Sequence, residues 1–290
     1  MIRQNKFNFS MAVLILMGLP LLWIGILLIS SEISFDPEAS KEVYRFPLHL
    51  KIGETEWWYL MINLGAIFFP FVLSFDKKVH FYKKWRYLIP GIAINAVLFI
   101  SWDIIFTEAG IWGFNERYVN FIILGLPLGE WLFFLTVPYA CVFVHECLLC
   151  YFKSDPFKNY DRAILISLIV IFTVVGLLNL FRAYTAWTFL LSAALLTIHL
   201  LFIPNSYRTR FYLAYFVSLI PFTIVNGILT GGYNEEPVVI YNNSHNLSSV
   251  IGFRFFSIPF DDFIYGFLMM LITVSVYEYL RTKHKKTSEK

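Results

Sequence analysis

Long apolar stretches with almost no charge constrain this chain more than any other feature. Several of them run for about 18 residues or more, the length at which an α-helix crosses the roughly 30 Å of hydrocarbon in a bilayer. Only 15% of the residues are charged, whereas a soluble domain carries about 25%. So much apolar surface does not fit inside one aqueous core, and the sequence predicts an all-α, polytopic membrane bundle.

Eight stretches have this length and character. They are residues 9–29, 57–75, 88–106, 126–151, 163–181, 186–203, 211–229 and 259–280. The first follows a short basic start and is too long for a typical signal-peptide core, so we expect an uncleaved anchor helix there.

The distribution of Lys and Arg predicts how the spans are oriented. Positively charged short loops stay on the cytoplasmic side of a membrane. Of the 23 Lys and Arg residues, 17 fall in the N-terminus, the C-terminal tail and every second loop. We therefore expect a multi-pass protein of the cell (inner) membrane with both termini in the cytoplasm. The basic tail is expected to bind the membrane lipid surface, and we expect no nucleic-acid partner.

The chain contains an internal repeat at an offset near 132. Residues 126–130 (LPLGE) correspond to residues 258–262 (IPFDD), and a glutamate, Glu146 or Glu278, follows the proline of each segment at the same spacing. Each repeat holds three spans, with the span 163–181 between the repeats. Four crossings from one repeat start to the next restore the direction, so we predict parallel repeats related by an axis along the membrane normal.

This repeat predicts the organisation of the whole chain. The expected parts are an N-terminal anchor helix and outer loop (1–56), a first repeat (57–152), a linking helix (153–185), a second repeat (186–282) and a basic cytoplasmic tail (283–290).

Acidic side chains within the spans are the candidates for chemistry, because ionisable groups in a membrane are costly and usually functional. Glu130 and Asp262 lie in the first turn of equivalent helices, so the repeat brings them to one depth; Asp261 and Asp103 are further candidates. Two carboxyls that share one proton in a buried site provide a general acid beside a base. The structural alternative is that the acids only cap their helices, where negative charge favours the helix dipole.

Aromatic residues flank both acids, and no cofactor motif is present. Rings beside a carboxyl pair stabilise a carbocation through their negative faces, although such patterns are also common in lipid-facing packing. The absence of a G-x-G-x-x-G motif disfavours a nicotinamide or flavin site. The cluster of His, Glu and Cys at residues 145–150 is a weak metal signal, because its side chains do not all point one way on a helix. We expect no cofactor and no metal.

Several short motifs recur in order across both repeats. They are residues 75–78, 102–103, 126–134, 138–141, 221–230, 252–254, 258–265 and 277–278. In these motifs, residues 57–282 resemble the lycopene cyclase domain family, the membrane carotenoid cyclases of the heterodimeric or tandem-repeat type. The resemblance implies a lycopene β-cyclase, an isomerase that protonates a terminal double bond of lycopene, closes a ring from the tertiary cation and loses a proton, without redox change.

The resemblance also implies site residues and a substrate. The acid chemistry is expected from Glu130, Asp262 and Asp261, and contacts to lycopene or another acyclic carotenoid from Asp103, Trp131, Phe133, Phe134, Asn226, Arg254 and Tyr265. One acid would protonate the substrate, and the other would orient it or receive the proton. The chain departs from the family pattern Pro-x-Glu-Glu at Gly129, where the first acid is missing.

Two other functions fit the same residues. A carotenoid hydratase, or a related polyene-modifying enzyme, would admit one water to trap the cation. A proton-coupled small-molecule transporter, a different class, would use the acids as a relay. The acids cluster at one interface and the spans have few polar residues to line an aqueous path, which disfavours the transporter. The sequence leaves open whether the protein is a homo-oligomer.

Overall fold

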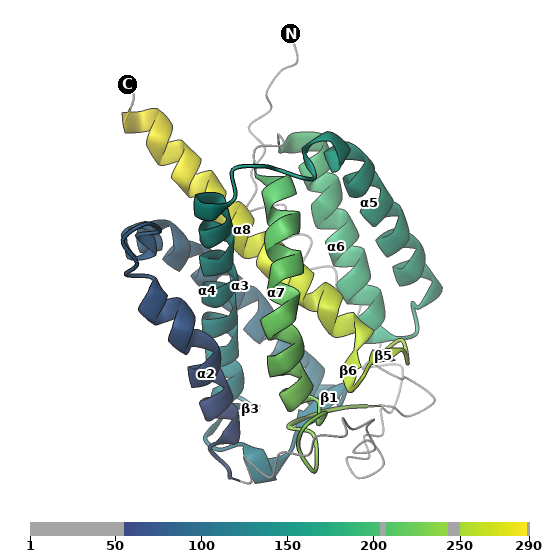
Figure 1. The fold of residues 1–290 in the computed structure, drawn as a ribbon. Helices are drawn as coiled ribbons and strands as arrows, with labels where there is room; N and C mark the ends of the chain where they lie inside the picture. Colours follow the sequence, from purple (N-terminus) through teal and green to yellow (C-terminus); the bar gives the residue numbers. More distant parts are fainter. Residues whose placement is uncertain (1–54, 204–206, 243–249, 289–290) are drawn as a thin grey trace.

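The computed structural model describes residues 55–203, 207–242 and 250–288. The predicted anchor span 9–29 lies outside these residues. The described part holds seven α-helices: α2 (Trp58–Leu73), α3 (Trp85–Glu108), α4 (Leu128–Tyr151), α5 (Asp161–Leu178), α6 (Ala183–Phe202), α7 (Arg208–Leu229) and α8 (Phe260–Ser288). Single turns of 3₁₀ helix occur at Phe81–Lys84, Glu116–Tyr118 and Lys158–Tyr160. Figure 1 shows the helices as one bundle, with α8 running obliquely through it.

Six of the helices, α3 to α8, are long and apolar enough to cross a membrane, which confirms the predicted polytopic helical bundle. The seventh, α2, is shorter than the predicted span 57–75. Its 16 residues extend about 24 Å at a rise of 1.5 Å per residue. The helix ends where the Ser74 hydroxyl turns back to the carbonyl of Pro70 at 2.6 Å and Asp76 accepts the backbone N–H of Lys78 at 2.8 Å.

A short β-hairpin precedes each of the two acid-bearing helices. The strand β2 (Ile122–Ile123) pairs with β3 (Leu126–Pro127) before α4. The strand β5 (Arg254–Phe255) pairs with β6 (Ile258–Pro259) before α8, in the same register at an offset of 132. These matched hairpins lie at one end of the bundle (Figure 1) and confirm the internal repeat.

The two repeats also pair with each other through β1 (Trp112–Phe114) and β4 (Val239–Tyr241), which are antiparallel. The pairing is reciprocal, as a two-fold relation requires. The side-chain amide of Asn115 donates to the carbonyl of Pro237 at 3.2 Å, and that of Asn242 donates to the carbonyl of Gly110 at 2.8 Å. This strand pair ties the repeats together at the end of the bundle where the acids are expected.

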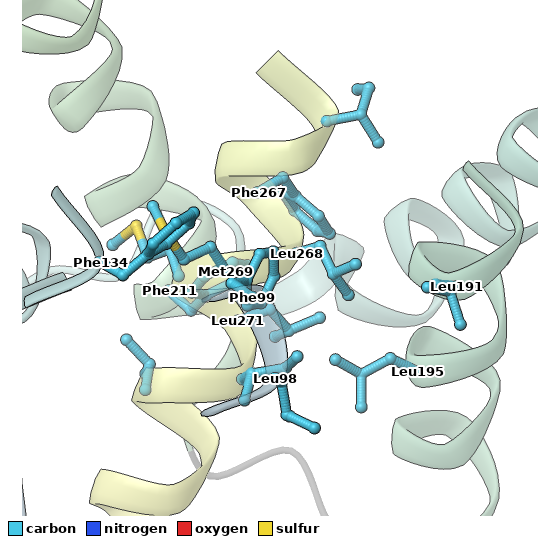
Figure 2. Close-up of a cluster of buried hydrophobic side chains, with 14 of the residues drawn as sticks. Leu98, Phe99, Phe134, Leu191, Leu195, Phe211, Phe267, Leu268, Met269 and Leu271 are labelled. Atoms are coloured by element: carbon cyan, nitrogen blue, oxygen red, sulfur yellow. The ribbon is translucent and has the colours of Figure 1, made fainter. Parts of the chain in front are cut away.

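Helix α8 forms the centre of the bundle, where it contacts α3, α4, α6 and α7. Figure 2 shows its apolar side chains packed among residues of the neighbouring helices. Those residues come from α3 (Leu98, Phe99), α4 (Phe134), α6 (Leu191, Leu195) and α7 (Phe211), around Phe267, Leu268, Met269 and Leu271 of α8. Their burial keeps α8 fixed relative to both repeats, so the residues at its start have defined positions.

The other ends of α4 and α8 are joined by a charged network. Glu146 accepts hydrogen bonds from Tyr277 at 2.7 Å and from Arg281 at 2.5 Å, and it also contacts Lys84. Glu278 is 3.1 Å from His145. The repeat thus predicted two equivalent glutamates, and both lie in one cluster at the end opposite the hairpins.

Candidate active site

A cavity of about 690 Å³ lies between α2, α4, α7 and α8. Three carboxyl groups line it, one from each of α3, α4 and α8: Asp103, Glu130 and Asp262. All three lie near the hairpin end of their helices. Away from that end, the lining is apolar, with residues such as Phe69, Val144, Met269 and Met270. The cavity is therefore an apolar chamber with carboxyl groups at one end.

Glu130 reaches the cavity from the first turn of α4 and accepts a hydrogen bond from the hydroxyl of Tyr59. The Tyr59 ring packs on the backbone of Gly129, where an added Cβ would lie 2.5 Å from the ring. Asn63 donates to the Gly129 carbonyl at 2.9 Å. The missing acid at position 129 thus has a physical reason, because the space that its side chain would need holds the Tyr59 ring.

Asp262, in the first turn of α8, is surrounded by hydrogen-bond donors. The hydroxyl of Tyr241 lies 2.9 Å from each of its two oxygens. The hydroxyl of Tyr184 donates to Oδ1 at 2.9 Å and the side-chain amide of Asn226 to Oδ2 at 2.7 Å. Asp262 is 5% exposed, so these bonds replace the water that a buried carboxyl group loses.

Tyr59 and Tyr184 are equivalent residues that our sequence analysis missed. Each lies in the first turn of the first helix of its repeat, and each donates to the acid in the third helix. Their offset of 125 differs from the offset of 132 that relates the acid motifs, because the loops inside the two repeats differ in length. An alignment of the repeats helix by helix could have found the pair.

Asp103 is buried in the last turns of α3, where the Trp112 side chain hydrogen-bonds to it. Its Oδ2 atom has no hydrogen-bond partner within the described part of the chain. A bare carboxyl oxygen in an apolar site is costly unless a ligand or a proton satisfies it. This oxygen is itself buried, although the residue Asp103 lines the cavity.

Aromatic rings form the wall around the acids. Tyr184 contacts Trp112, Tyr241 and Tyr265 with centroid separations of 5.0, 6.0 and 5.6 Å. Burial and the neighbouring charge of Asp262 raise the pKa of Tyr241 well above its usual range, so its hydroxyl keeps its proton. Rings placed in this way stabilise positive charge on a bound group through their negative faces.

The predicted site residues divide into two groups. Those that line the cavity are Asp103, Glu130, Phe133, Asn226, Asp262 and Tyr265. Those that do not are Trp131, Phe134, Arg254 and Asp261.

Each residue of the second group has another partner. Asp261 accepts from Thr185 and from the backbone of Ile251, and Trp131 donates to the carbonyl of Ile123 at 3.1 Å. Phe134 packs against Phe99 in the core. Arg254 lies one layer behind the site, with its guanidinium 5.7 Å from the centre of the Tyr241 ring. The predicted roles of these residues stay predictions, and their contacts favour a supporting function.

Comparison with protein families found one match. A family model described as lycopene cyclase matches residues 56–148 and 181–280, together more than half of the chain. Each matched segment contains one of the two acid motifs, and α5 falls between the segments. No curated protein and no solved structure matched the chain.

Proposed function

The chain belongs to the lycopene cyclase family and is thus an enzyme of carotenoid cyclisation, and on this premise we propose that it closes β-ionone rings at the ends of lycopene. The observation that carries the proposal is the convergence of carboxyl groups from both repeats, Glu130 and Asp262, on one apolar cavity. Cyclisation needs an acid, a base and a dry apolar chamber at the same place. The two carboxyl groups and the apolar lining of this cavity support these three roles.

The proposed reaction is an isomerisation in which every atom of the substrate is kept. A proton adds to the terminal double bond and leaves a tertiary cation. A second double bond of the chain attacks this cation, and the new carbon–carbon bond closes a six-membered ring. Loss of a proton from a ring carbon then gives the β-ionone group, so the enzyme regains the proton that it supplied. The reaction needs no electron transfer and no cofactor.

The hydrogen bonds around the two acids support different roles for them. Asp262 accepts from three side chains, and donors to a charged carboxylate favour the charged form. Within the described part of the chain, the Tyr59 hydroxyl donates to one oxygen of Glu130, and we assign the other oxygen to the substrate. We therefore assign Glu130 as the proton donor, and Asp262 as the carboxylate that stabilises the cation and receives the returning proton.

The character of the lining favours ring closure over hydration. The chamber wall is largely apolar and aromatic, and Asn226, Tyr241 and Asp262 at its acid end already bond to one another. A carbocation in such a chamber meets the double bond of its own chain more readily than a water molecule. The hydratase alternative needs a water site beside the cation, and the described lining provides little polar surface for one.

We further propose that the hairpin end of the bundle faces away from the cytoplasm. The basic residues 77, 78, 83 and 84 lie in the connection between α2 and α3, and residue 86 lies in the first turn of α3, at the opposite end from the acids. Positively charged loops remain cytoplasmic. Both termini would then be cytoplasmic, in a multi-pass protein of the cell membrane, with the acid end of the chamber near the outer interface.

The test is expression of this chain in a bacterium that accumulates lycopene, followed by chromatography of the pigments with absorbance and mass detection. We expect products with the mass of lycopene and one or two β-rings. A mass gain of one water would identify a hydratase instead. Unchanged lycopene, with the protein present in the membrane fraction, would contradict the proposed function.

A further inference from the structure

The cavity reaches the surface of the bundle between α2 and α7. Its lining includes Met61 and Phe69 of α2 and Ile224 of α7, which are 51%, 67% and 54% exposed. Helix α7 is long and apolar enough to cross a membrane, and α2 is a shorter apolar helix. The surface around these side chains therefore faces lipid if both helices lie in the membrane. The chamber therefore has a side opening among the described residues, flanked by apolar side chains.

Gly65 lies at this opening. It lines the cavity, it is exposed, and a Cβ placed on it would meet no atom within 4 Å. Its neighbour Ala66 also lines the cavity. The backbone conformation of Gly65 is helical, with no positive φ that would require glycine. Because glycine has no side chain, space remains at the opening.

The equivalent place in the second repeat is closed. At the offset of 125 that relates Tyr59 to Tyr184, Gly65 corresponds to Leu190 of α6. An added Cβ on Gly176 of α5 would lie 2.6 Å from Leu190, which shows how tightly α5 covers this position. On the inner side, Leu191 and Leu195 of α6 and Phe267 of α8 belong to the buried hydrophobic core (Figure 2). Among the described residues, the side opening at Gly65 in the first repeat thus has no counterpart at Leu190 in the second.

We propose that the acyclic polyene enters this chamber sideways from the bilayer, between α2 and α7, and that Gly65 sets the width of the entrance. The inference rests on the proposed function and extends it to how the substrate binds. One end of the chain reaches Glu130 and Asp262, while the rest passes Gly65 and remains in lipid. Lycopene has two identical ends, and a single chamber processes them in separate binding events.

The experiment compares Gly65→Trp and Gly65→Leu with Leu64→Trp in lycopene-accumulating cells. Leu64 is the matched control, because it is 63% exposed on the same helix and does not line the cavity. Each variant is purified in detergent, and two quantities are measured. One is the rate at which it forms rings, and the other is the amount of lycopene that stays bound per amount of protein. Gly65→Ala adds a small step to the series.

We expect Gly65→Trp to lose about tenfold or more in both quantities, which corresponds to about 1.4 kcal/mol, because the indole would occupy the open space at the entrance. Gly65→Leu should be intermediate and Gly65→Ala should lose the least of the three Gly65 variants, whereas Leu64→Trp should stay close to wild type. Equal lycopene retention and equal rates of ring formation in Gly65→Trp and Leu64→Trp would overturn the proposal that the substrate enters at Gly65. If the wild type retained lycopene without converting it, the proposed function would fail. The lycopene retained by the Gly65 and Leu64 variants would still show whether the substrate enters at Gly65.

Discussion

The hydroxyl of Tyr59 is the contact that holds Glu130 at the cavity wall. Within the described part of the chain, the hydrogen-bond donors on Asp262 come from α6, α7 and β4, all in the second repeat, whereas the side-chain donor to Glu130 is this tyrosine of α2. A carboxyl group with a single fixed contact keeps one oxygen for a substrate. Proton transfer by a well-placed acid contributes about a hundredfold or more to a rate, and the orientation of that acid is part of the effect.

Replacing Tyr59 by Phe should lower ring formation by about tenfold, because Glu130 then loses the donor that orients it. The amount of lycopene retained per protein should stay near the wild-type level, since phenylalanine keeps the aromatic ring of Tyr59. Tyr212→Phe is the control, because Tyr212 is buried but does not line the cavity. Equal rates for the Tyr59→Phe and Tyr212→Phe variants would show that the hydroxyl has no part in the reaction.

At Gly129, we expect that even a methyl group disturbs the site. Its Cβ would lie 2.5 Å from the Tyr59 ring, and such overpacking costs about 1–3 kcal/mol. Gly129→Ala should lower the thermal unfolding midpoint of the otherwise unchanged protein. The same substitution should lower the midpoint of the Tyr59→Ala variant much less. Gly65→Ala, at a position with open space, is the control for adding a methyl group to a helix. Additive losses in the double variant would mean that the two residues are not coupled.

The acids of the site could be predicted from the sequence, whereas their partners could not. Asp103, Glu130 and Asp262 stand out because a charge in an apolar span has few explanations other than function. Tyr184 and Tyr241 do not stand out, because tyrosine is common in membrane proteins and the partner of its hydroxyl depends on the packing of distant elements. The position of Trp131 outside the cavity has the same cause, since its rotation on α4 is set by helix packing.

At the scale of elements, the pairing of β1 with β4 connects the two halves of the site. Tyr241 of β4 donates to Asp262, and Trp112 of β1 hydrogen-bonds to Asp103. The reciprocal bonds from Asn115 and Asn242 hold this pair of strands in register. The strands are three residues long, so their stability depends on these side chains.

Asn115→Ala should therefore lower the free energy of unfolding by about 1–3 kcal/mol, because it leaves the buried Pro237 carbonyl without a donor. A fall in the thermal unfolding midpoint in detergent is the measurement. Asn179→Ala, which removes a bond within the end of a single helix, is the matched control and should lower it less. If the two midpoints fell equally, the strand pair would have no special part in joining the repeats.

Helix length and repeat spacing explain how far the elements could be predicted. The spans α3 to α8 follow from long apolar runs, whereas the hairpins before α4 and α8 were not predicted, although they lie at the offset of the matched acid motifs. The early end of α2 did not follow, because Phe75 continues the apolar run while the hydrogen bonds of Ser74 and Asp76 already form a turn. The pairing of β1 with β4 joins residues more than a hundred positions apart, and no local pattern indicates such a contact.

For the whole molecule, orientation in the membrane is the property that follows from charge. A reporter that is active only in the cytoplasm should work when fused after residue 288, and should fail when inserted in the β2–β3 hairpin. The positive loops between α2 and α3 and between α4 and α5 lie at the end of the bundle away from the hairpins (Figure 1). The reverse pattern of reporter activity would place the acid end of the chamber in the cytoplasmic leaflet.

The central feature of the proposed mechanism is that acids from both repeats act in one chamber. The most direct measurement is the pigment profile of lycopene-accumulating cells that carry Glu130→Gln, Asp262→Asn or Asp261→Asn, with equal amounts of protein in the membrane. Glu130→Gln and Asp262→Asn should each reduce ring formation by about a hundredfold or more. Asp261→Asn, beside Asp262 but outside the cavity lining, should keep most of the activity. Full activity in both Glu130→Gln and Asp262→Asn would contradict the mechanism.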